Sequence, residues 1–256
     1  LGKDPQKRLD QVLRIILART GIKENNFRLK LSTNMSLMGG MGSSAALAVS
    51  ILRCLDKQYS LGLSNEKMNT IAFEVEKVFH QNPSGIDNTV STYGGMIRFT
   101  KKEGENKVEP IELANPIEVV LVDTGTIEDT GRAVEFVRTQ KEKDPKKFSD
   151  IFEQYSALEK EAEKNIRQAN WKEAGKLMDK NQKLLEQMNL SSTQLGEIIF
   201  AAKNAGALGA KLTGTGRGGN AIALTPGKAL QERVAKACSD IGYKTHKISL
   251  GIKVKK

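Results

Sequence analysis

An isolated carboxylate in a turn-forming segment has the clearest chemical potential in this sequence. Asp87 follows residues 82–85, Asn-Pro-Ser-Gly, and these four residue types favour turns for different local reasons. A tight turn fixes the direction in which the Asp87 side chain leaves the backbone. A carboxylate held in this way suits a general base acting on a hydroxyl. The alternative is structural, with Asp87 as the N-cap of a short helix through residues 90–91, and spacing alone favours the cap.

A glycine-rich segment offers a second kind of chemistry. Residues 38–46 read Met-Gly-Gly-Met-Gly-Ser-Ser-Ala-Ala and run directly into an apolar helical stretch at 47–52. Glycines let the backbone approach an anion, and the first amides and the dipole of a helix attract one. Ser43 and Ser44 add hydroxyls that can cap the helix, contact phosphate or ligate a hard cation. The segment is neither a Walker A loop nor a dinucleotide fingerprint, and a glycine turn with a serine N-cap explains it equally well.

A second glycine-rich segment lies far along the chain. Residues 211–220 read Lys-Leu-Thr-Gly-Thr-Gly-Arg-Gly-Gly-Asn and precede an apolar strand at 221–224. Taken alone, this pattern indicates an ordinary hairpin loop. Two such loops together with the isolated Asp87 carboxylate favour an enzyme that handles phosphate.

The three segments together resemble a known family. Residues 40–46 resemble the phosphate loop of the GHMP kinases, and residues 211–219 resemble their third motif. Residues 82–88, followed by 90–95, are similar to the mevalonate kinase branch of that family in particular. The likeness continues weakly over nearly the whole chain. It implies phosphorylation of mevalonate by ATP, with Mg²⁺ as the cofactor, in isoprenoid biosynthesis.

The resemblance also assigns roles to individual residues. It makes Asp87 the catalytic residue, and it makes Ser44 and Glu76 the ligands of Mg²⁺, although Glu76 alone reads as a solvated glutamate near a helix end. A pair of protein oxygens suits Mg²⁺, which keeps water and phosphate for its other positions. The remaining assignments are ATP binding by Thr33, Gly40, Met41, Gly42, Ser43, Ser44 and Ala45, and substrate binding by His80, Thr130, Gly214 and Gly216.

The sequence also departs from the family pattern. Ser36 stands where proline is usual, and Met38, Gln81 and Arg217 stand where glycine is common. Arg217 can either add a phosphate contact or face solvent. The family's opening strands and its catalytic lysine have no counterpart, so we expect the chain to lack the N-terminal strands and to be inactive as it stands.

Periodicity predicts a mixed α+β chain. An amphipathic helix follows Pro5 and ends at Gly21, residues 27–31 alternate as a half-buried strand, and Ser64 caps a helix through Phe79. A hairpin is expected over 96–112, a buried strand over 117–122 and helices over 129–204. The resemblance implies a domain like ribosomal protein S5 domain 2 over residues 1–115 and a ferredoxin-like domain over 116–256.

Composition limits the other possible functions. No run of 18 apolar residues could span a membrane. The net charge of +10 suggests a noncatalytic RNA-binding module of S5-like fold, but aromatics are only 5% and the lysines are dispersed. We therefore expect no nucleic-acid or membrane partner. A homodimer is compatible with the sequence, and phosphomevalonate kinase is the nearest alternative enzyme. Cys54 and Cys238 are expected to be buried thiols in a reducing cytoplasm.

Overall fold

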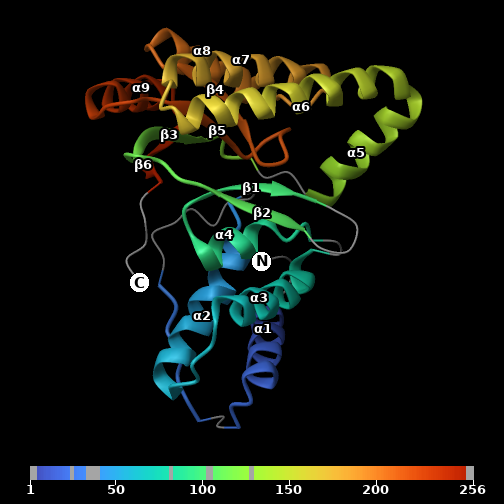
Figure 1. Ribbon diagram of the computed structural model, residues 1–256, viewed down its shortest axis with the longest axis vertical. Coiled ribbons are helices and arrows are strands. Elements are labelled where there is room, and N and C mark those ends of the chain that lie inside the picture. Colours follow the sequence, from blue (N-terminus) through green and yellow to red (C-terminus); the bar gives the residue numbers. More distant parts are fainter. Residues whose placement is uncertain are drawn as a thin grey trace. The chain divides into compact units, whose positions relative to one another are not determined.

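Two units divide the chain between Glu109 and Pro110 (Figure 1), six residues before the join expected at 115. The computed structural model describes residues 5–23, 26–32, 41–80, 83–101, 106–126 and 130–251. None of the helices in these ranges is both long and apolar enough to cross a membrane.

The N-terminal unit contains four described helices and a hairpin. Three helices share one apolar core, in which Val12, Ile16, Leu52, Ile71 and Val75 are at most 1% exposed. The spacing of these side chains at three and four residues is what predicts the helices, and each buried side chain contributes roughly 1.5–3 kcal/mol. The elements are α1 (Pro5–Thr20), α2 (Ser43–Tyr59), α3 (Asn65–Phe79), α4 (Ile86–Tyr93), β1 (Met96–Thr100) and β2 (Lys107–Ile111).

Local signals set the ends of these helices. Gly21 follows α1 with a φ of +73°, a left-handed conformation that glycine adopts without strain. The Ser64 side chain accepts a hydrogen bond from the Lys67 backbone N–H at 3.2 Å. The predicted first helix and the predicted Ser64 cap are therefore confirmed.

The predicted strand at 27–31 is wrong, because residues 26–32 form neither helix nor strand. The alternation is present in burial, since Phe27 and Leu29 are half-buried while Arg28 and Lys30 are exposed. Leu29 packs against the helical core, but Leu31 is 45% exposed. Alternating burial needs only one apolar neighbour, whereas a strand also needs a hydrogen-bonded one, and none of the described strands pairs with this segment.

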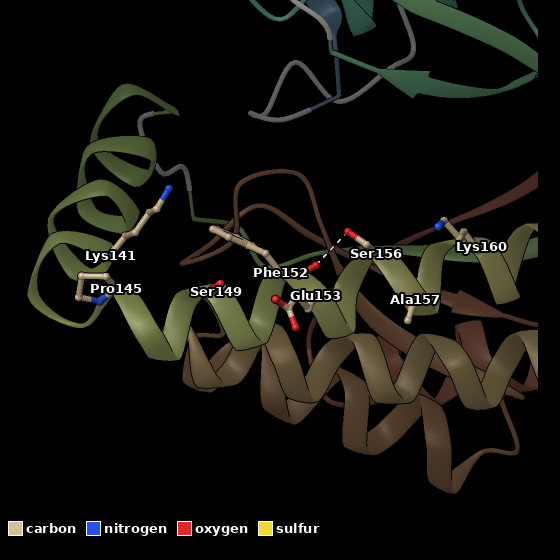
Figure 2. A pocket seen from close by; sticks show the side chains of 8 residues that line it. All are labelled: Lys141, Pro145, Ser149, Phe152, Glu153, Ser156, Ala157 and Lys160. Atoms are coloured by element: carbon tan, nitrogen blue, oxygen red, sulfur yellow. Dashed lines mark hydrogen bonds between the residues drawn. The ribbon is translucent and has the colours of Figure 1, made fainter.

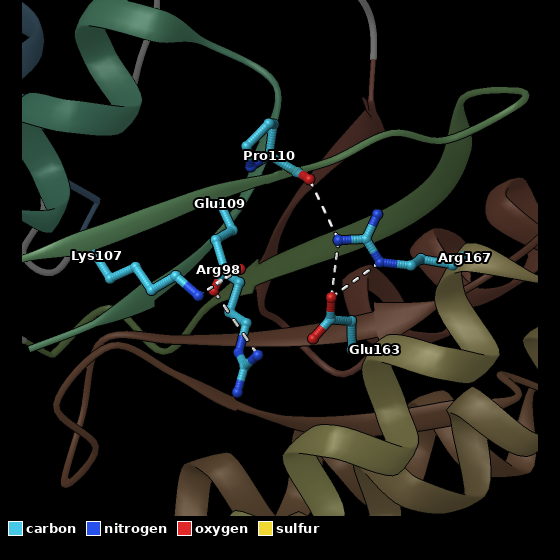
Figure 3. Close-up of polar contacts among 6 residues, drawn as sticks. All are labelled: Arg98, Lys107, Glu109, Pro110, Glu163 and Arg167. Atoms are coloured by element: carbon cyan, nitrogen blue, oxygen red, sulfur yellow. Dashed lines mark hydrogen bonds and ion pairs between the residues drawn. The ribbon is translucent and has the colours of Figure 1, made fainter.

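The hairpin predicted over 96–112 is confirmed as the two-stranded sheet β1-β2. One ion pair of Glu109 joins the two strands, and the other lies within β2. Glu109 lies 2.8 Å from the Lys107 ammonium and 3.8 Å from the Arg98 guanidinium (Figure 3). Ion pairs at such partly exposed positions contribute about 0–1 kcal/mol each.

The C-terminal unit is built on a four-stranded antiparallel sheet of order β4-β5-β3-β6. The elements occur in the order strand, helical segment, two strands, helix and strand. This is the ferredoxin-like arrangement that was predicted. The expected strands at 117–122 and 221–224 and the expected helices over 129–204 are confirmed. The elements are β3 (Ile117–Asp123), α5 (Thr130–Lys143), α6 (Pro145–Arg167), α7 (Trp171–Gln187), α8 (Thr193–Asn204), β4 (Gly209–Thr213), β5 (Asn220–Leu224), α9 (Lys228–Asp240) and β6 (Lys244–Leu250).

One face of this sheet carries the larger core of the unit. Alternate residues such as Val120, Leu212 and Ala221 face this core, which α8 and α9 cover (Figure 1). Cys238 on α9 is fully buried there, as expected. Cys54 on α2 is exposed, so the prediction that it is buried was wrong: it lies on the outer side of a helix whose apolar face points elsewhere.

Helix α7 covers the free edge of β4. Side chains of α7 accept hydrogen bonds from the outward amides of the strand, Asp179 from Ala210 N–H at 3.0 Å and Gln182 from Leu212 N–H at 2.9 Å. An edge strand with satisfied amides cannot recruit another chain. Within the same unit, Arg167 at the end of α6 pairs with Glu163 at 2.8 Å and donates to the carbonyl of Pro110, which also belongs to this unit, at 3.3 Å (Figure 3).

Candidate active site

The predicted phosphate loop leads into α2 through a left-handed glycine. Gly42 is the N-cap of α2, with φ 62° and ψ 29°, and no side chain caps the helix. The serine N-cap alternative is therefore wrong, because Ser43 and Ser44 already lie inside the first turn with Ala45. The first amides of α2 keep their capacity to bind an anion, and the helix dipole favours one there.

Ser44 and Glu76 meet although 32 residues separate them. The Ser44 hydroxyl donates to Glu76 Oε1 at 2.6 Å. Glu76 lies on α3 and is only 2% exposed, so the interpretation as a solvated glutamate is wrong. Burial raises the pKa of Glu76, while the Ser44 hydrogen bond and the charge of His80 lower it and the charge of Asp87 raises it further.

Asp87 lies in the first turn of α4 and is directed at the start of α2. Gly85 is the N-cap of α4, with φ 89°, so the N-cap alternative for Asp87 is wrong. A Cβ added at Gly42 would lie 3.2 Å from Asp87 Cγ and 3.3 Å from Oδ1. Asp87 keeps solvent access as a residue, but partial loss of hydration raises the pKa of its carboxyl, an effect that the charge of His80 opposes.

Ser44, Glu76, His80 and Asp87 thus form one group, here named the Asp87 cluster. His80 ends α3, and its backbone N–H donates to the Glu76 carbonyl at 2.9 Å. Its charge acts on both carboxyl groups. The cluster combines a helix N-terminus, two hard oxygens 2.6 Å apart and a partly dehydrated carboxylate, which are the parts that positioning of a phosphorylated ligand and a hydroxyl requires.

Magnesium would be held by few protein groups at this site. Among the described residues no group of three or more His, Cys, Asp or Glu side chains could hold a metal ion. The Ser44 hydroxyl and the Glu76 carboxylate are oxygen donors that already converge. This donor set fits Mg²⁺, which takes one or two protein oxygens and completes its octahedron with water and phosphate.

The second glycine-rich segment is the loop 214–219 between β4 and β5. Gly214, Gly216 and Gly219 have φ between +74° and +86°. A Cβ at Gly216 would overlap the Leu190 carbonyl, and one at Gly218 would lie 2.8 Å from Thr126 Oγ1. Close packing against neighbouring backbone therefore requires small residues here, whatever ligand the loop binds.

Arg217 holds this loop to α5. Its guanidinium carbon lies 4.3 Å from the centre of the Phe136 ring, and its backbone N–H donates to the Leu190 carbonyl at 2.6 Å. Arg217 is an exposed residue, as the solvent-facing alternative expects, and its side chain also stacks on an aromatic ring. Arg217 also has a φ of +61°, which explains why glycine suits the position. Thr130 is half-buried and begins the same helix.

Two of the predicted site residues, Thr33 and Gly40, lie outside the described residues, as do Ser36, Met38 and Gln81. Sequence reasoning also missed functional candidates. It treated Lys211 only as part of a motif. The alternation of this lysine with the core residues Ala210 and Leu212 indicates that it lies on the other face of the strand. Phe136 has no sequence signal that links it to Arg217.

A surface hollow is present in the C-terminal unit. It is lined along α5 and α6 by residues between Lys141 and Lys160, with the exposed Phe152 ring at its centre (Figure 2). Lys141 Nζ lies 5.7 Å from the centre of that ring. None of the residues that line this hollow was predicted as a site residue.

Comparison with known proteins decides the family. The model described as GHMP kinases N terminal domain matches residues 7–95, and that described as GHMP kinases C terminal matches residues 162–244. The chain belongs to the GHMP kinase family. Its two units are accordingly the N-terminal and C-terminal domains of the GHMP kinase fold.

The most similar relatives carry one name. The mevalonate kinase of Pyrococcus abyssi is 35% identical over 230 residues, 88% of this chain and 65% of that protein. The mevalonate kinase of Thermococcus gammatolerans is 31% identical over 237 residues, 91% and 69% of the two chains. A crystal structure of L. major mevalonate kinase in complex with R-mevalonate matches with a TM-score of 0.85 and 27% identity, covering 96% of this chain and 79% of that one. The chain therefore spans about two thirds of the length of these curated relatives.

Proposed function

We propose that this GHMP kinase phosphorylates mevalonate, transferring the γ-phosphoryl group of ATP to its primary hydroxyl. The arrangement of Ser44, Glu76 and Asp87 around Gly42 carries the proposal. It provides a helix N-terminus for phosphate, two oxygens for a divalent cation and a fixed carboxylate for the hydroxyl. The substrate itself is suggested by the relatives and by the solved mevalonate complex.

The proposed chemistry divides among few groups. Asp87 takes the proton of the hydroxyl as its oxygen attacks the γ-phosphorus, and the bond between that phosphorus and the bridging oxygen of ADP breaks. The amides of Gly42, Ser43, Ser44 and Ala45 face the phosphates, and Ser44 and Glu76 hold Mg²⁺. When bound, Mg²⁺ neutralises phosphate charge. His80, next to both carboxyl groups, is placed to contact the substrate.

The protonation states fit this assignment. The pKa of Asp87 is raised, which makes its carboxylate a stronger base than a fully hydrated one, and a general base works best when its pKa approaches the working pH. Glu76 also has a raised pKa, because burial removes water from its carboxyl group. A bound divalent cation would favour the ionised form and lower that pKa.

The decisive test is the release of ADP by the purified full-length protein with one acceptor at a time. Mevalonate, phosphomevalonate, galactose and homoserine are compared at equal concentration, with and without Mg²⁺. We expect turnover with mevalonate that exceeds turnover with the other three by at least about a hundredfold. Preferential turnover of phosphomevalonate would replace the proposal with its nearest alternative, and release of ADP from none of the four would reject a small-alcohol kinase of this kind.

A further inference from the structure

Helix α4 buries polar side chains and exposes apolar ones. Its buried residues are Asn88, Thr89 and Thr92, each at most 4% exposed. Its large apolar residues Ile86 and Tyr93 are instead 39% and 44% exposed. A helix of eight residues is not stable on its own, so α4 depends on the elements around it, and the buried face that meets them is polar.

One polar contact joins α4 to α3. Asn88 Nδ2 donates to Asn69 Oδ1 at 2.7 Å and to the Asn69 carbonyl at 3.4 Å. Asn88 directly follows Asp87, whereas Asn69 lies seven residues before Glu76 on α3, which is about 10 Å along the helix axis. Asn69 therefore holds the helix that carries Asp87 from a position outside the Asp87 cluster.

A second polar contact joins α4 to α2. The Arg53 guanidinium donates to the Thr92 carbonyl at 2.6 Å, and a cation is favourable at the C-terminal end of a helix. Helix α4 thus packs against both α2 and α3 within the N-terminal unit (Figure 1). These two helices supply Ser44 and Glu76, so the contacts tie the Asp87 carboxylate to its partners in the cluster.

The polar face of α4 is not the arrangement that stability favours. Asn88 Oδ1 and Thr92 Oγ1 are buried, and the described residues give neither atom a hydrogen-bond partner. Apolar side chains would avoid the cost of such atoms. Apolar contact is non-directional, however, whereas a hydrogen bond depends on angle as well as distance. Hydrogen bonds therefore restrict rotation of α4 about its axis more closely than apolar packing would.

We propose that Asn69, acting through Asn88, and Arg53, acting through the Thr92 carbonyl, are positioning residues that direct Asp87 at the start of α2. Helical side chains reach about 5–6 Å from the axis, so a rotation of about 10° moves a side-chain tip by about 1 Å. A misplacement of that size costs about a hundredfold in rate. The inference rests on the proposed function, because it assigns these residues to the reaction of Asp87.

The test compares Asn69→Ala with Asn170→Ala in the full-length protein. Asn170 is a matched control in the C-terminal unit, where its Nδ2 donates to Asn165 Oδ1 at 3.0 Å. Each change removes the partner of a buried asparagine, Asn88 at 2% or Asn165 at 8% exposure, so both should lower Tm by similar amounts. We expect only Asn69→Ala to lower kcat, by at least about tenfold, with KM for ATP and mevalonate within about twofold.

Two further comparisons separate positioning from general loosening of the fold. Asn69→Asp keeps an acceptor for Asn88 Nδ2, so its kcat should stay within about threefold of the unmodified protein. In an Asp87→Asn background, Asn69→Ala should lower kcat by less than about twofold further, because the displaced group no longer acts as a base. Arg53→Met should repeat the pattern of Asn69→Ala. If Asn69→Ala does not fold, the double variant Asn69→Leu/Asn88→Leu replaces it, since removing both partners is nearly neutral for stability.

Crystal structures of the variants give a readout that does not depend on activity. Asn69→Ala should show the Asp87 carboxyl displaced from Gly42, and Asn170→Ala should leave it in place. An undisplaced Asp87 with kcat equal in Asn69→Ala and Asn170→Ala would overturn the proposal and make Asn69 a structural residue. Displacement of Asp87 in Asn69→Ala, with no mevalonate phosphorylation by the unmodified protein, would keep the positioning role and reject the assigned reaction.

Discussion

Gly42 offers a way to move the Asp87 carboxylate without changing its chemistry. Alanine at this position would be unfavourable for two reasons. It would occupy a left-handed conformation, with φ 62°, and its Cβ would lie 3.2 Å from both Cβ and Cγ of Asp87. Gly62 provides a matched control in the same domain, because its φ is +65° and a Cβ there would meet nothing within 4 Å.

The two effects have separable magnitudes. Left-handed strain in a residue with a Cβ costs about 1–2 kcal/mol, which lowers Tm by roughly 2–8 °C in a protein of this size. Carbon atoms prefer separations of about 3.5–4.0 Å, so Asp87 must retreat by about half an ångström. If a misplacement of about 1 Å costs about a hundredfold in rate, half of that distance costs about tenfold.

The assay is steady-state phosphorylation of mevalonate by the full-length protein, together with thermal unfolding, for both variants. We expect Gly42→Ala and Gly62→Ala to lower Tm by similar amounts, while only Gly42→Ala lowers kcat, by about tenfold. An effect on the phosphate loop alone would instead raise KM for ATP.

A double variant decides whether the loss passes through Asp87. In an Asp87→Asn background, Gly42→Ala should add little further loss of kcat, because the group that it displaces no longer acts as a base. An equal fall of kcat in Gly42→Ala and Gly62→Ala, or a full additional tenfold loss in the Asp87→Asn background, would refute the role given to this contact.

Three further predictions concern the same residues. Asp87→Asn should lower kcat by roughly a hundredfold or more with ATP binding retained in equilibrium titration, and near-normal turnover would leave Asp87 without a catalytic role. Glu76→Gln and Ser44→Ala should each raise the Mg²⁺ concentration for half-maximal activity. The raised pKa of Glu76 favours the folded state only below about pH 4.5, and that benefit is lost as pH rises through the folded pKa. Glu76→Gln should therefore also raise Tm at pH 7, and raise it less at pH 4.5. Arg217→Gly relieves left-handed strain and loses the stack on Phe136, so the free energy of unfolding should change by less than about 1 kcal/mol. Equal kinetic changes in Arg217→Gly and Phe136→Leu would assign Arg217 to loop positioning. A rise in KM for ATP in Arg217→Gly alone would favour a phosphate contact.

Periodic patterns predicted most elements of the fold, and local chemistry predicted several helix ends. The apolar faces of α1 and α3 and the Ser64 cap follow from spacings within one element. Segment 27–31 failed because strand formation depends on a partner that its own residues do not specify. The burial of Glu76 could not be predicted from the sequence either, since it depends on how α2 and α3 pack together.

The candidate site was predicted by motif and resemblance, but its geometry was not. Sequence placed Ser44 and Glu76 in one role through resemblance alone, and the 2.6 Å hydrogen bond between them is a finding of the structure. The N-cap hypothesis for Asp87 failed because Gly85, two residues earlier, takes the left-handed conformation that begins α4. A run of turn formers indicates that a helix starts but does not decide which residue caps it.

The N-terminal domain contains a charge that folding alone does not explain. A buried carboxylate such as Glu76 disfavours the folded state unless a full opposite charge compensates it. An apolar residue at this position would pack at lower cost. Glu76 lies beside the N-terminus of α2, where it accepts a hydrogen bond from Ser44. If a bound cation compensates this charge, saturating Mg²⁺ and nucleotide should stabilise the unmodified protein more than Glu76→Gln. The variant would thus begin with the higher Tm and gain less on ligand binding, a reversal that a purely structural role for Glu76 would not produce.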